Sequence, residues 1–269
     1  EKEHLYPLRV TTDALLLAGV EVLWKRISTQ PEADLTAAAA QADVVVAAVG
    51  LNADLEGEEM KVELEGFSGG DKTSIDLPAD QRRLLEQAKA TGKPLVVVLM
   101  NGSTLDLSWA KEHASAIIEA WYPGQAGGLA VGNVIAGKAN PAGRLPLTFY
   151  RDVAELPPFE DYSMRGRTYR YFAGTPVYPF GHGLSYSTFE YGPVRIEAVD
   201  GVVEHGLRVT TTVRNTSERV GEEVAQLYLD PPEFEGAPRL ALRGFQRFEL
   251  WPGEQRTVSF DLSPRDLSF

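Results

Sequence analysis

The hydrophobic pattern of this chain changes character once, between about residues 150 and 190. Before this region, continuous apolar runs alternate with segments of helical periodicity; after it, apolar and polar residues alternate one by one. Continuous apolar runs are typical of strands buried on both faces, whereas alternation is typical of strands with one face in a core. The pattern therefore predicts two domains of different fold class, which a length of 269 residues allows.

The first part, residues 1–150, is predicted to be an α/β domain. Buried-strand patterns occupy the segments 20–24, 43–50, 94–100 and 114–121. Helical patterns occupy the segments 32–41, 78–91 and 128–137. Strands that alternate with helices indicate a mainly parallel sheet with helices on both faces.

The last part, residues 191–269, is predicted to be an antiparallel, immunoglobulin-like β-sandwich. Its alternating strands occupy the segments 208–214, 223–229, 244–250 and 256–262, with turn residues between them. Residues 151–190 are rich in proline, tyrosine and phenylalanine and show little periodicity. We expect this connection to pack against both domains as a structural clamp, because aromatic rings bury large areas.

Composition excludes several classes of partner. The formal net charge is −12 and the basic residues are scattered apart from a modest cluster at 165–170, whereas nucleic-acid binding usually shows itself as a basic face. The longest apolar stretches, 44–51 and 95–100, are far shorter than the roughly 20 residues that span a bilayer. The chain has no cysteine, and hence no disulfide or thiolate metal site. We expect neither a nucleic-acid nor a membrane partner.

A long acidic loop, residues 51–76, is the strongest candidate for chemistry. It follows the carboxyl end of a predicted buried strand, where open α/β sheets place their ligand-binding crevices. Its carboxylates are Asp54, Glu56, Glu58, Glu59, Glu63, Glu65, Asp71 and Asp76. A carboxyl group in a partly apolar loop can act as a general acid. The alternative from composition alone is an ordinary acidic surface loop.

No other motif predicts a cofactor. The glycines at 66–70 are not followed by the lysine of a phosphate loop, and those at 124–128 favour a tight turn and close helix packing. The four histidines are dispersed and form no metal-binding pair. We therefore expect no metal and no organic cofactor.

The order of several motifs resembles the C-terminal part of glycoside hydrolase family 3, in its β-xylosidase and β-glucosidase branches. The motifs are LEGEE (55–59), GGDKTSIDLPADQRRLL (69–85), AWYPGQAGG (120–128), GRTYRYF (166–172) and YPFGHGLSYSTF (178–189). The resemblance implies an α/β sandwich followed by a fibronectin type III-like domain. In this family a (β/α)8 barrel precedes them, so we expect a chain that is incomplete at both ends.

The resemblance also implies a function and a catalytic residue. The family consists of retaining exo-β-glycosidases that release terminal non-reducing β-D-xylosyl or β-D-glucosyl residues from oligosaccharides without a cofactor. Its nucleophile lies on the barrel, which would be supplied from outside this chain, and its acid/base glutamate lies on the acidic loop. Glu58 matches the acid/base position and Asp71 a later aspartate of the pattern. The neighbouring glutamates that stay open as alternatives are Glu56, Glu59, Glu63 and Glu65.

Two further expectations accompany this reading. The resemblance suggests a periplasmic or secreted protein, although residues 1–7 are polar and show no leader peptide. The competing function is a non-catalytic carbohydrate-binding or scaffold module that shares the fold but lacks the barrel.

Overall fold

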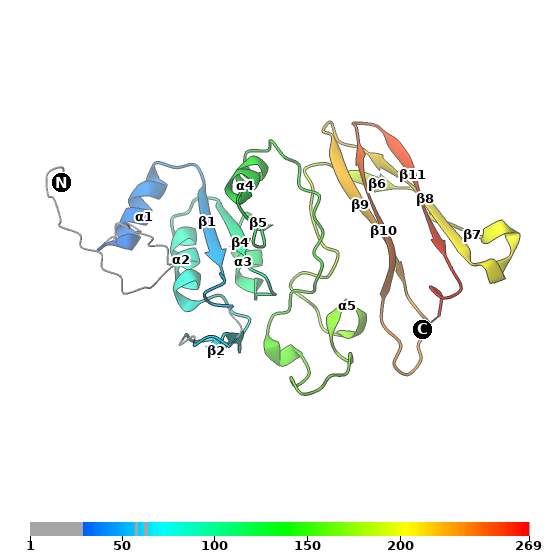
Figure 1. Ribbon diagram of the computed structural model, residues 1–269. Helices are drawn as coiled ribbons and strands as arrows, with labels where there is room; N and C mark the ends of the chain where they lie inside the picture. The colour runs from blue at the N-terminus through cyan, green and yellow to red at the C-terminus, as the bar shows by residue number, and fades with distance from the viewer. Residues whose placement is uncertain (1–28, 57–58, 62–63, 269) are drawn as a thin grey trace, which may run out of the picture.

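The computed structural model describes residues 29–56, 59–61 and 64–268 (Figure 1). The strand predicted at 20–24 lies outside these residues. The helices of the first domain are α1 (Pro31–Ala40), α2 (Ala79–Ala90), α3 (Ser108–His113) and α4 (Gly127–Ile135). Its main strands are β1 (Val45–Gly50), β4 (Leu95–Met100) and β5 (Ala116–Glu119).

The three main strands form a parallel sheet in the order β1-β4-β5, which confirms the predicted α/β class. The central strand β4 is buried, and Leu95, Val97 and Leu99 are inaccessible to solvent. Leu85 and Ala88 of α2 pack into the same core. This core holds the sheet in place, and with it the edge at which the strands end.

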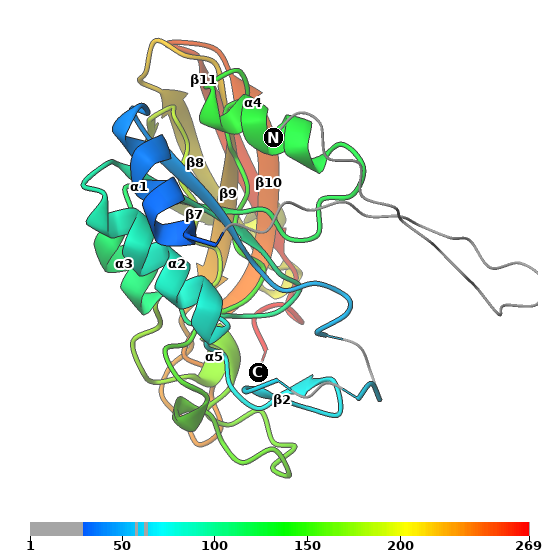
Figure 2. The same ribbon diagram turned by 90° about the vertical axis from the view of Figure 1, so that its left-hand side faces the viewer.

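The covering of the sheet differs between its two faces. Figure 2 shows α1, α2 and α3 gathered on one side, with α4 apart from them. Val44, just before β1, and Val46 within it are 41% and 46% exposed. Within the described residues, the face of β1 that carries Val44 and Val46 is therefore partly exposed.

A glycine and a glutamine fix the point at which the acidic loop leaves β1. Gly50 has a φ of +135°, and a Cβ there would lie 1.9 Å from the carbonyl oxygen of Met100, so only glycine fits. The side chain of Gln81 in α2 accepts the N–H of Gly50 at 2.7 Å and donates to its carbonyl at 2.8 Å. Both backbone groups are thus paired at the strand end.

The acidic loop contains a hairpin that the sequence analysis did not predict. It is formed by β2 (Phe67–Ser68) and β3 (Asp71–Lys72), which pair in antiparallel fashion. Gly69 and Gly70 connect them with φ values of +63° and +91°. Two consecutive positive φ angles favour a tight hairpin turn with glycine at both positions. The strands are too short to leave an alternating pattern in the sequence.

The second domain consists of antiparallel strands, as predicted. One sheet contains β6 (Phe189–Tyr191), β7 (Arg195–Ala198), β8 (Leu207–Asn215) and β11 (Gln255–Leu262). The other contains β9 (Gly221–Leu229) and β10 (Ala241–Leu250). The core includes side chains of both sheets: Val213, Ala225, Phe248, Leu250 and Val258. The 3₁₀ helices η2 (Val199–Gly201) and η3 (Val203–His205) follow β7.

The connection between the domains is ordered and includes η1 (Val153–Glu155) and α5 (Thr168–Tyr171). Tyr169 stacks on Phe180 with ring centroids 4.2 Å apart and meets Tyr228 of β9 edge-on at 6.0 Å. The Tyr169 hydroxyl accepts the N–H of Leu242 in β10 at 3.1 Å. The connection thus contacts the second domain through a ring–ring contact with β9 and through a hydrogen bond to the backbone of β10.

A buried ion pair joins the two domains. Arg144, which follows α4, donates to both carboxylate oxygens of Glu223 in β9 at 3.0 Å. The two side chains are only 14% and 10% exposed. Tyr191 of β6 also donates to Glu223, at 3.3 Å. Removal of one partner from such a pair leaves a buried charge without compensation.

We expect Glu223→Ala to lower the free energy of unfolding by about 3 kcal/mol, because Arg144 is left buried and unpaired. Glu222→Ala is the matched control, since Glu222 pairs with Arg247 at a surface where the side chains are 36% and 61% exposed. Its loss should be below about 1 kcal/mol. Urea titrations measure both, and equal losses would contradict a clamp at Glu223.

We expect Phe180→Ala to lower the free energy of unfolding by about 2 kcal/mol, since it removes a half-buried ring from the stack with Tyr169. Phe159→Ala, at a side chain that is 85% exposed, should change it by less than about 0.5 kcal/mol. Thermal and urea unfolding report both changes. If Phe180→Ala behaves like the control, the connection does not clamp the domains.

Candidate active site

Polar side chains gather where the three parallel strands end. Glu56 follows β1, Ser103 follows β4, and Glu119 and Tyr122 lie at and after the end of β5. Parallel strands place their carboxyl ends at one edge of the sheet, so segments that are distant in sequence meet there. The acidic loop singled out in the sequence begins at this edge.

Glu56 is the centre of the hydrogen bonds at this edge. The hydroxyl of Ser103 donates a short hydrogen bond to Oε1, and the hydroxyl of Tyr122 donates a short one to Oε2. Each carboxylate oxygen therefore has its own donor, and the two donors come from different strand ends. The loop after β1 is tied to the ends of both neighbouring strands through this one side chain.

These contacts keep Glu56 ionised. Burial raises the pKa of Glu56, but its hydrogen bonds and the charge of Lys72 outweigh burial, so the pKa lies below its usual value. Conversely, burial and the hydrogen bond and charge of Glu56 raise the pKa of Tyr122, which stays a hydroxyl donor. Glu56 therefore serves better as a fixed carboxylate than as a proton donor.

Lys72 brings the hairpin of the acidic loop to the same place. Its Nζ donates to the carbonyl of Thr104 at 2.6 Å, and Lys72 lies in β3. Burial lowers the pKa of Lys72, while the nearby charge of Glu56 raises it. The loop is thus attached to the segment after β4 at two points, Glu56 and Lys72.

Glu119, the last residue of β5, is a second carboxyl group at the edge. Its Oε1 accepts the N–H of Trp121 at 3.1 Å. Burial raises the pKa of Glu119 to about 7, against the lowering effects of the Trp121 N–H and the Asn101 side chain. Perturbed carboxyl groups are common at functional sites, and also in structural networks.

The predicted site residues differ in whether the structure describes them and in how exposed they are. Glu58, the predicted acid/base, and Glu63 lie outside the described residues. Glu59 and Glu65 are exposed, as is Asp71. Of the glutamates considered from the sequence, Glu56 is the one whose contacts with the other strand ends are described.

Four residues of this cluster were missed by the sequence analysis. They are Lys72, Ser103, Glu119 and Tyr122. Each lies near the carboxyl edge, which is the edge of the sheet where the carboxyl ends of β1, β4 and β5 meet. Their positions at or after the ends of predicted strands, or in the acidic loop, were the sequence feature that could have identified them.

The described residues contain no group of three or more acidic or histidine side chains arranged to hold a metal ion. His182 stacks on Tyr178 with centroids 4.9 Å apart, and burial and nearby cations lower its pKa. His113 packs against Trp109 at 4.7 Å. Across the same described part of the chain, no helix has the length and apolar character to cross a membrane.

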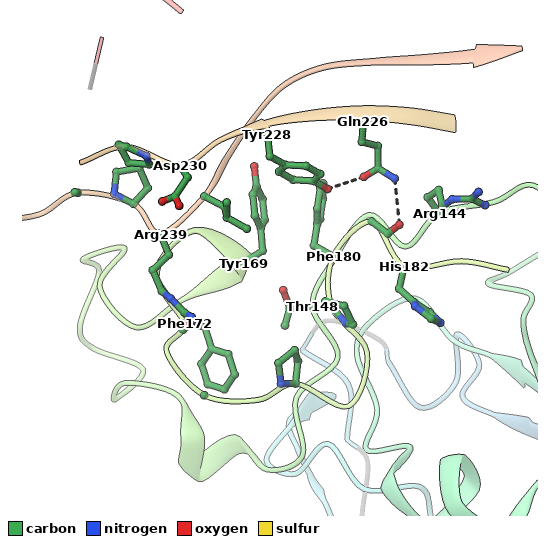
Figure 3. A pocket seen from close by; sticks show the side chains of 18 of the residues that line it. Arg144, Thr148, Tyr169, Phe172, Phe180, His182, Gln226, Tyr228, Asp230 and Arg239 are labelled. Atoms are coloured by element: carbon green, nitrogen blue, oxygen red, sulfur yellow. Dashed lines mark hydrogen bonds between the residues drawn. The ribbon is translucent and has the colours of Figure 1, made fainter. Parts of the chain in front are cut away.

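A cavity of about 1170 Å³ lies between the connection and the second domain (Figure 3). Tyr169, Phe180 and Tyr228 line it, and the hydroxyl of Tyr228 donates to Gln226. The planes of Tyr169 and Phe180 are only 16° apart, so these rings cover each other's faces. This favours a role in joining the domains over stacking on a sugar.

A smaller cavity of about 480 Å³ adjoins the carboxyl edge. It is lined by 102–104 after β4 and by residues of the connection, including Met164 and Arg170. Tyr169 and Phe180 line both cavities. The connection therefore borders the candidate site as well as the second domain.

Comparison with known proteins identifies the class of this chain and then its family. Residues 9–186 match the model of the glycosyl hydrolase family 3 C-terminal domain, and residues 223–269 match that of the fibronectin type III-like domain. The fold and the matches are those of a glycosyl hydrolase. The chain belongs to glycosyl hydrolase family 3.

Named relatives include two kinds of glycosidase. The chain is 44% identical over 220 residues to a xylan 1,4-β-xylosidase of Xylanibacter ruminicola, covering 82% of this chain and 25% of that protein. It is 40% identical over 245 residues to a periplasmic β-glucosidase of Salmonella typhimurium, covering 86% and 31%. The chain thus spans about a quarter to a third of the length of these relatives.

Solved structures of two β-glucosidases have a similar fold and are likewise longer than this chain. A β-glucosidase from Erythrobacter marinus is 38% identical with a TM-score of 0.73, covering 87% of this chain and 31% of that one. A β-glucosidase of Bifidobacterium adolescentis is 32% identical with a TM-score of 0.76, covering 90% and 36%.

We expect Tyr122→Phe to destabilise the chain at pH 7 by about 1 kcal/mol, a value that allows for solvent screening of Glu56. The folded pKa of Glu56 lies below its ordinary 4.5, so its contribution is present above that pH and is lost as pH falls through the folded pKa. The deficit of the variant should therefore shrink towards pH 3.

Urea unfolding at pH 7 and pH 3 measures this deficit. Tyr162→Phe is the control, since Tyr162 is 88% exposed, and it should match the unmodified chain at both pH values. A deficit that is equal at both pH values would show that the Tyr122 hydroxyl does not stabilise an ionised Glu56.

Proposed function

We propose that this chain is the acid/base-bearing part of a retaining exo-β-glycosidase that releases terminal β-D-xylosyl or β-D-glucosyl residues from oligosaccharides. The observation that carries the proposal is the attachment of the acidic loop to the carboxyl edge through Glu56, Ser103 and Tyr122. A loop held at a ligand-binding edge can present a carboxyl group to a substrate. Family membership and the names of the relatives support the same reaction.

We propose Glu58 as the general acid and base. A general acid must carry a proton before the bond breaks. The lowered pKa of Glu56 makes that residue unsuitable and suits it to holding the loop instead. Glu58 follows two residues later in the LEGEE motif and matches the family pattern. Glu56 is then the anchor and Glu58 the reacting group.

The reaction would proceed in two steps. In the first, Glu58 protonates the glycosidic oxygen while a carboxylate nucleophile attacks the anomeric carbon and the leaving group departs. In the second, Glu58 removes a proton from water, which attacks the glycosyl-enzyme and releases the sugar. Retention requires the two carboxyl groups to lie about 5–5.5 Å apart.

The nucleophile is proposed to come from a (β/α)8 barrel outside this chain. The relatives are three to four times as long as the part that the chain covers, and a barrel needs about 250 residues. The carboxyl edge is then proposed to face the barrel mouth. We propose a periplasmic or secreted location, which the name of the Salmonella typhimurium relative supports and which cell fractionation tests.

We expect Glu58→Ala, in the complete enzyme, to slow turnover of xylobiose or cellobiose by about 10²–10⁴-fold, since general acid catalysis is lost. Aryl glycosides with good leaving groups need little protonation, so their glycosylation step should be spared. Azide should accelerate the second step and yield the β-glycosyl azide. Steady-state and burst kinetics separate the two steps.

The neighbouring glutamate provides the control. Glu59→Ala should retain near-normal turnover of the disaccharides. If Glu58→Ala retains activity while Glu59→Ala or Glu65→Ala loses it and responds to azide, the acid/base role belongs to that neighbour. If no variant of the loop affects turnover, the function is not that of a glycosidase with its acid/base on this loop.

A further inference from the structure

Among the buried polar atoms without a hydrogen-bond partner are the side-chain oxygens of a carboxyl group and an amide at the carboxyl edge. One is Oε2 of Glu119, whose other oxygen accepts the N–H of Trp121. The second is Oδ1 of Asn101, a residue with no exposed surface. Both belong to neighbouring ends of the parallel sheet, β5 and β4. Buried acceptors without donors are unfavourable unless the chemistry of one of them changes.

The orientation of the Asn101 amide is fixed by its other contact. Nδ2 donates to the carbonyl of Ser103 at 2.6 Å, and a carbonyl can only accept. Oδ1 therefore requires a donor from elsewhere. The Asn101 side chain lies close enough to Glu119 to lower its pKa, an effect that burial outweighs. A neutral carboxyl group on Glu119 carries one O–H donor, whereas an ionised one carries none.

The compensation for a negative charge on Glu119 is incomplete, because the Trp121 N–H and the Asn101 side chain lower its pKa less than burial raises it. The titratable groups of the hydrogen-bonded cluster at the same edge include Glu56, Lys72 and Tyr122. Lys72 donates to Thr104, and Tyr122 donates to Glu56. In the described part of the chain, no cation forms an ion pair with Glu119. An ionised Glu119 would hold a charge on the buried Oε2 atom without a cationic partner, which is costly.

We propose that Glu119 is a proton-dependent positioning residue: in its neutral form it holds the ends of β4 and β5 in the arrangement that fixes Glu56. Each of the two donors to Glu56 follows one member of this pair closely in sequence, Ser103 after Asn101 and Tyr122 after Glu119. Asn101 binds the carbonyl of Ser103, whose hydroxyl donates to Glu56. Glu119 binds the N–H of Trp121, the residue before Tyr122.

Ionisation of Glu119 would weaken this arrangement. The charged Oε2 must then acquire water or move, and either response displaces the segment that carries Trp121 and Tyr122. Trp121 already has a φ of +54°, a conformation that a tryptophan rarely adopts. The pKa of Glu119, raised by burial to about 7, places the change near neutral pH. The relevance of this positioning to catalysis rests on the proposed function. The positioning itself involves only residues of this chain.

The sign of the pH effect follows from linkage. Because the folded pKa lies above the ordinary 4.5, stability is fully present below that value and falls as pH rises through about 7. The full chain should therefore lose Tm between pH 5.5 and pH 8.5. Glu119→Gln keeps the shape of the neutral form and cannot ionise, so its loss should be smaller by about 3 °C or more.

The control is Glu112→Gln, at an exposed glutamate in α3, which should follow the unmodified chain. A second measurement needs no variant: the chain has four tryptophans, and selective ¹⁵N labelling gives four backbone amide signals. The Trp121 amide should titrate with a midpoint near 7. A midpoint below about 5, or equal Tm profiles for Glu119→Gln and the unmodified chain, would overturn the proposal.

In the complete enzyme, Glu119→Gln should flatten the fall of kcat between pH 6 and pH 8 with little change in KM. If the fall of kcat between pH 6 and pH 8 is the same in Glu119→Gln, the proposal that Glu119 positions Glu56 for catalysis is overturned. An enzyme without glycosidase activity would refute the proposed function alone, because the Tm and amide measurements still decide whether Glu119 is neutral in the folded chain.

Discussion

Parallel pairing of β1, β4 and β5 is the constraint on which the candidate site depends. It brings three strand ends to one edge, and so lets Glu56 accept hydrogen bonds from Ser103 and Tyr122. None of these contacts is local in sequence. A change that shifts the register of β4 against either neighbour would separate the acceptor from its donors, even with every side chain retained.

The contacts between the domains extend this constraint to the second half of the chain. Arg144 lies after α4 and binds β9, while Tyr169 stacks within the connection and binds β10. The connection also lines the small cavity beside the carboxyl edge. The β-sandwich is therefore attached to segments that border the candidate site, because the connection packs against both.

The sequence predicted those parts of the fold whose signals are local and repeated. The apolar runs at 43–50 and 94–100 and the alternation at 208–214 each correspond to a strand. The hairpin of β2 and β3, and the short helices α3 and α5, were missed because they contain too few residues to show a period.

The candidate site was predictable in place but not in composition. The loop after β1 was identified because it is long, acidic and follows a buried strand. The roles of Ser103, Tyr122 and Glu119 depend on which residues meet across the sheet, and this register is not visible in one sequence. The assignment of Glu58 as the acid/base depends on the family resemblance, and the described residues do not include Glu58.

The contact between Gln81 and Gly50 has a consequence for how the sheet can grow. Val45 and Leu51 donate towards β4, so the N–H and C=O of Gly50 point to the opposite side, where the carboxamide of Gln81 occupies them. The carboxamide imitates the hydrogen bonds of a neighbouring strand. A strand added alongside β1 can therefore pair with Val46 and Ala48 but must stop before Gly50. Helix α2 thus sets a length limit on any strand added alongside β1 and keeps the exit of the acidic loop clear of edge-to-edge pairing.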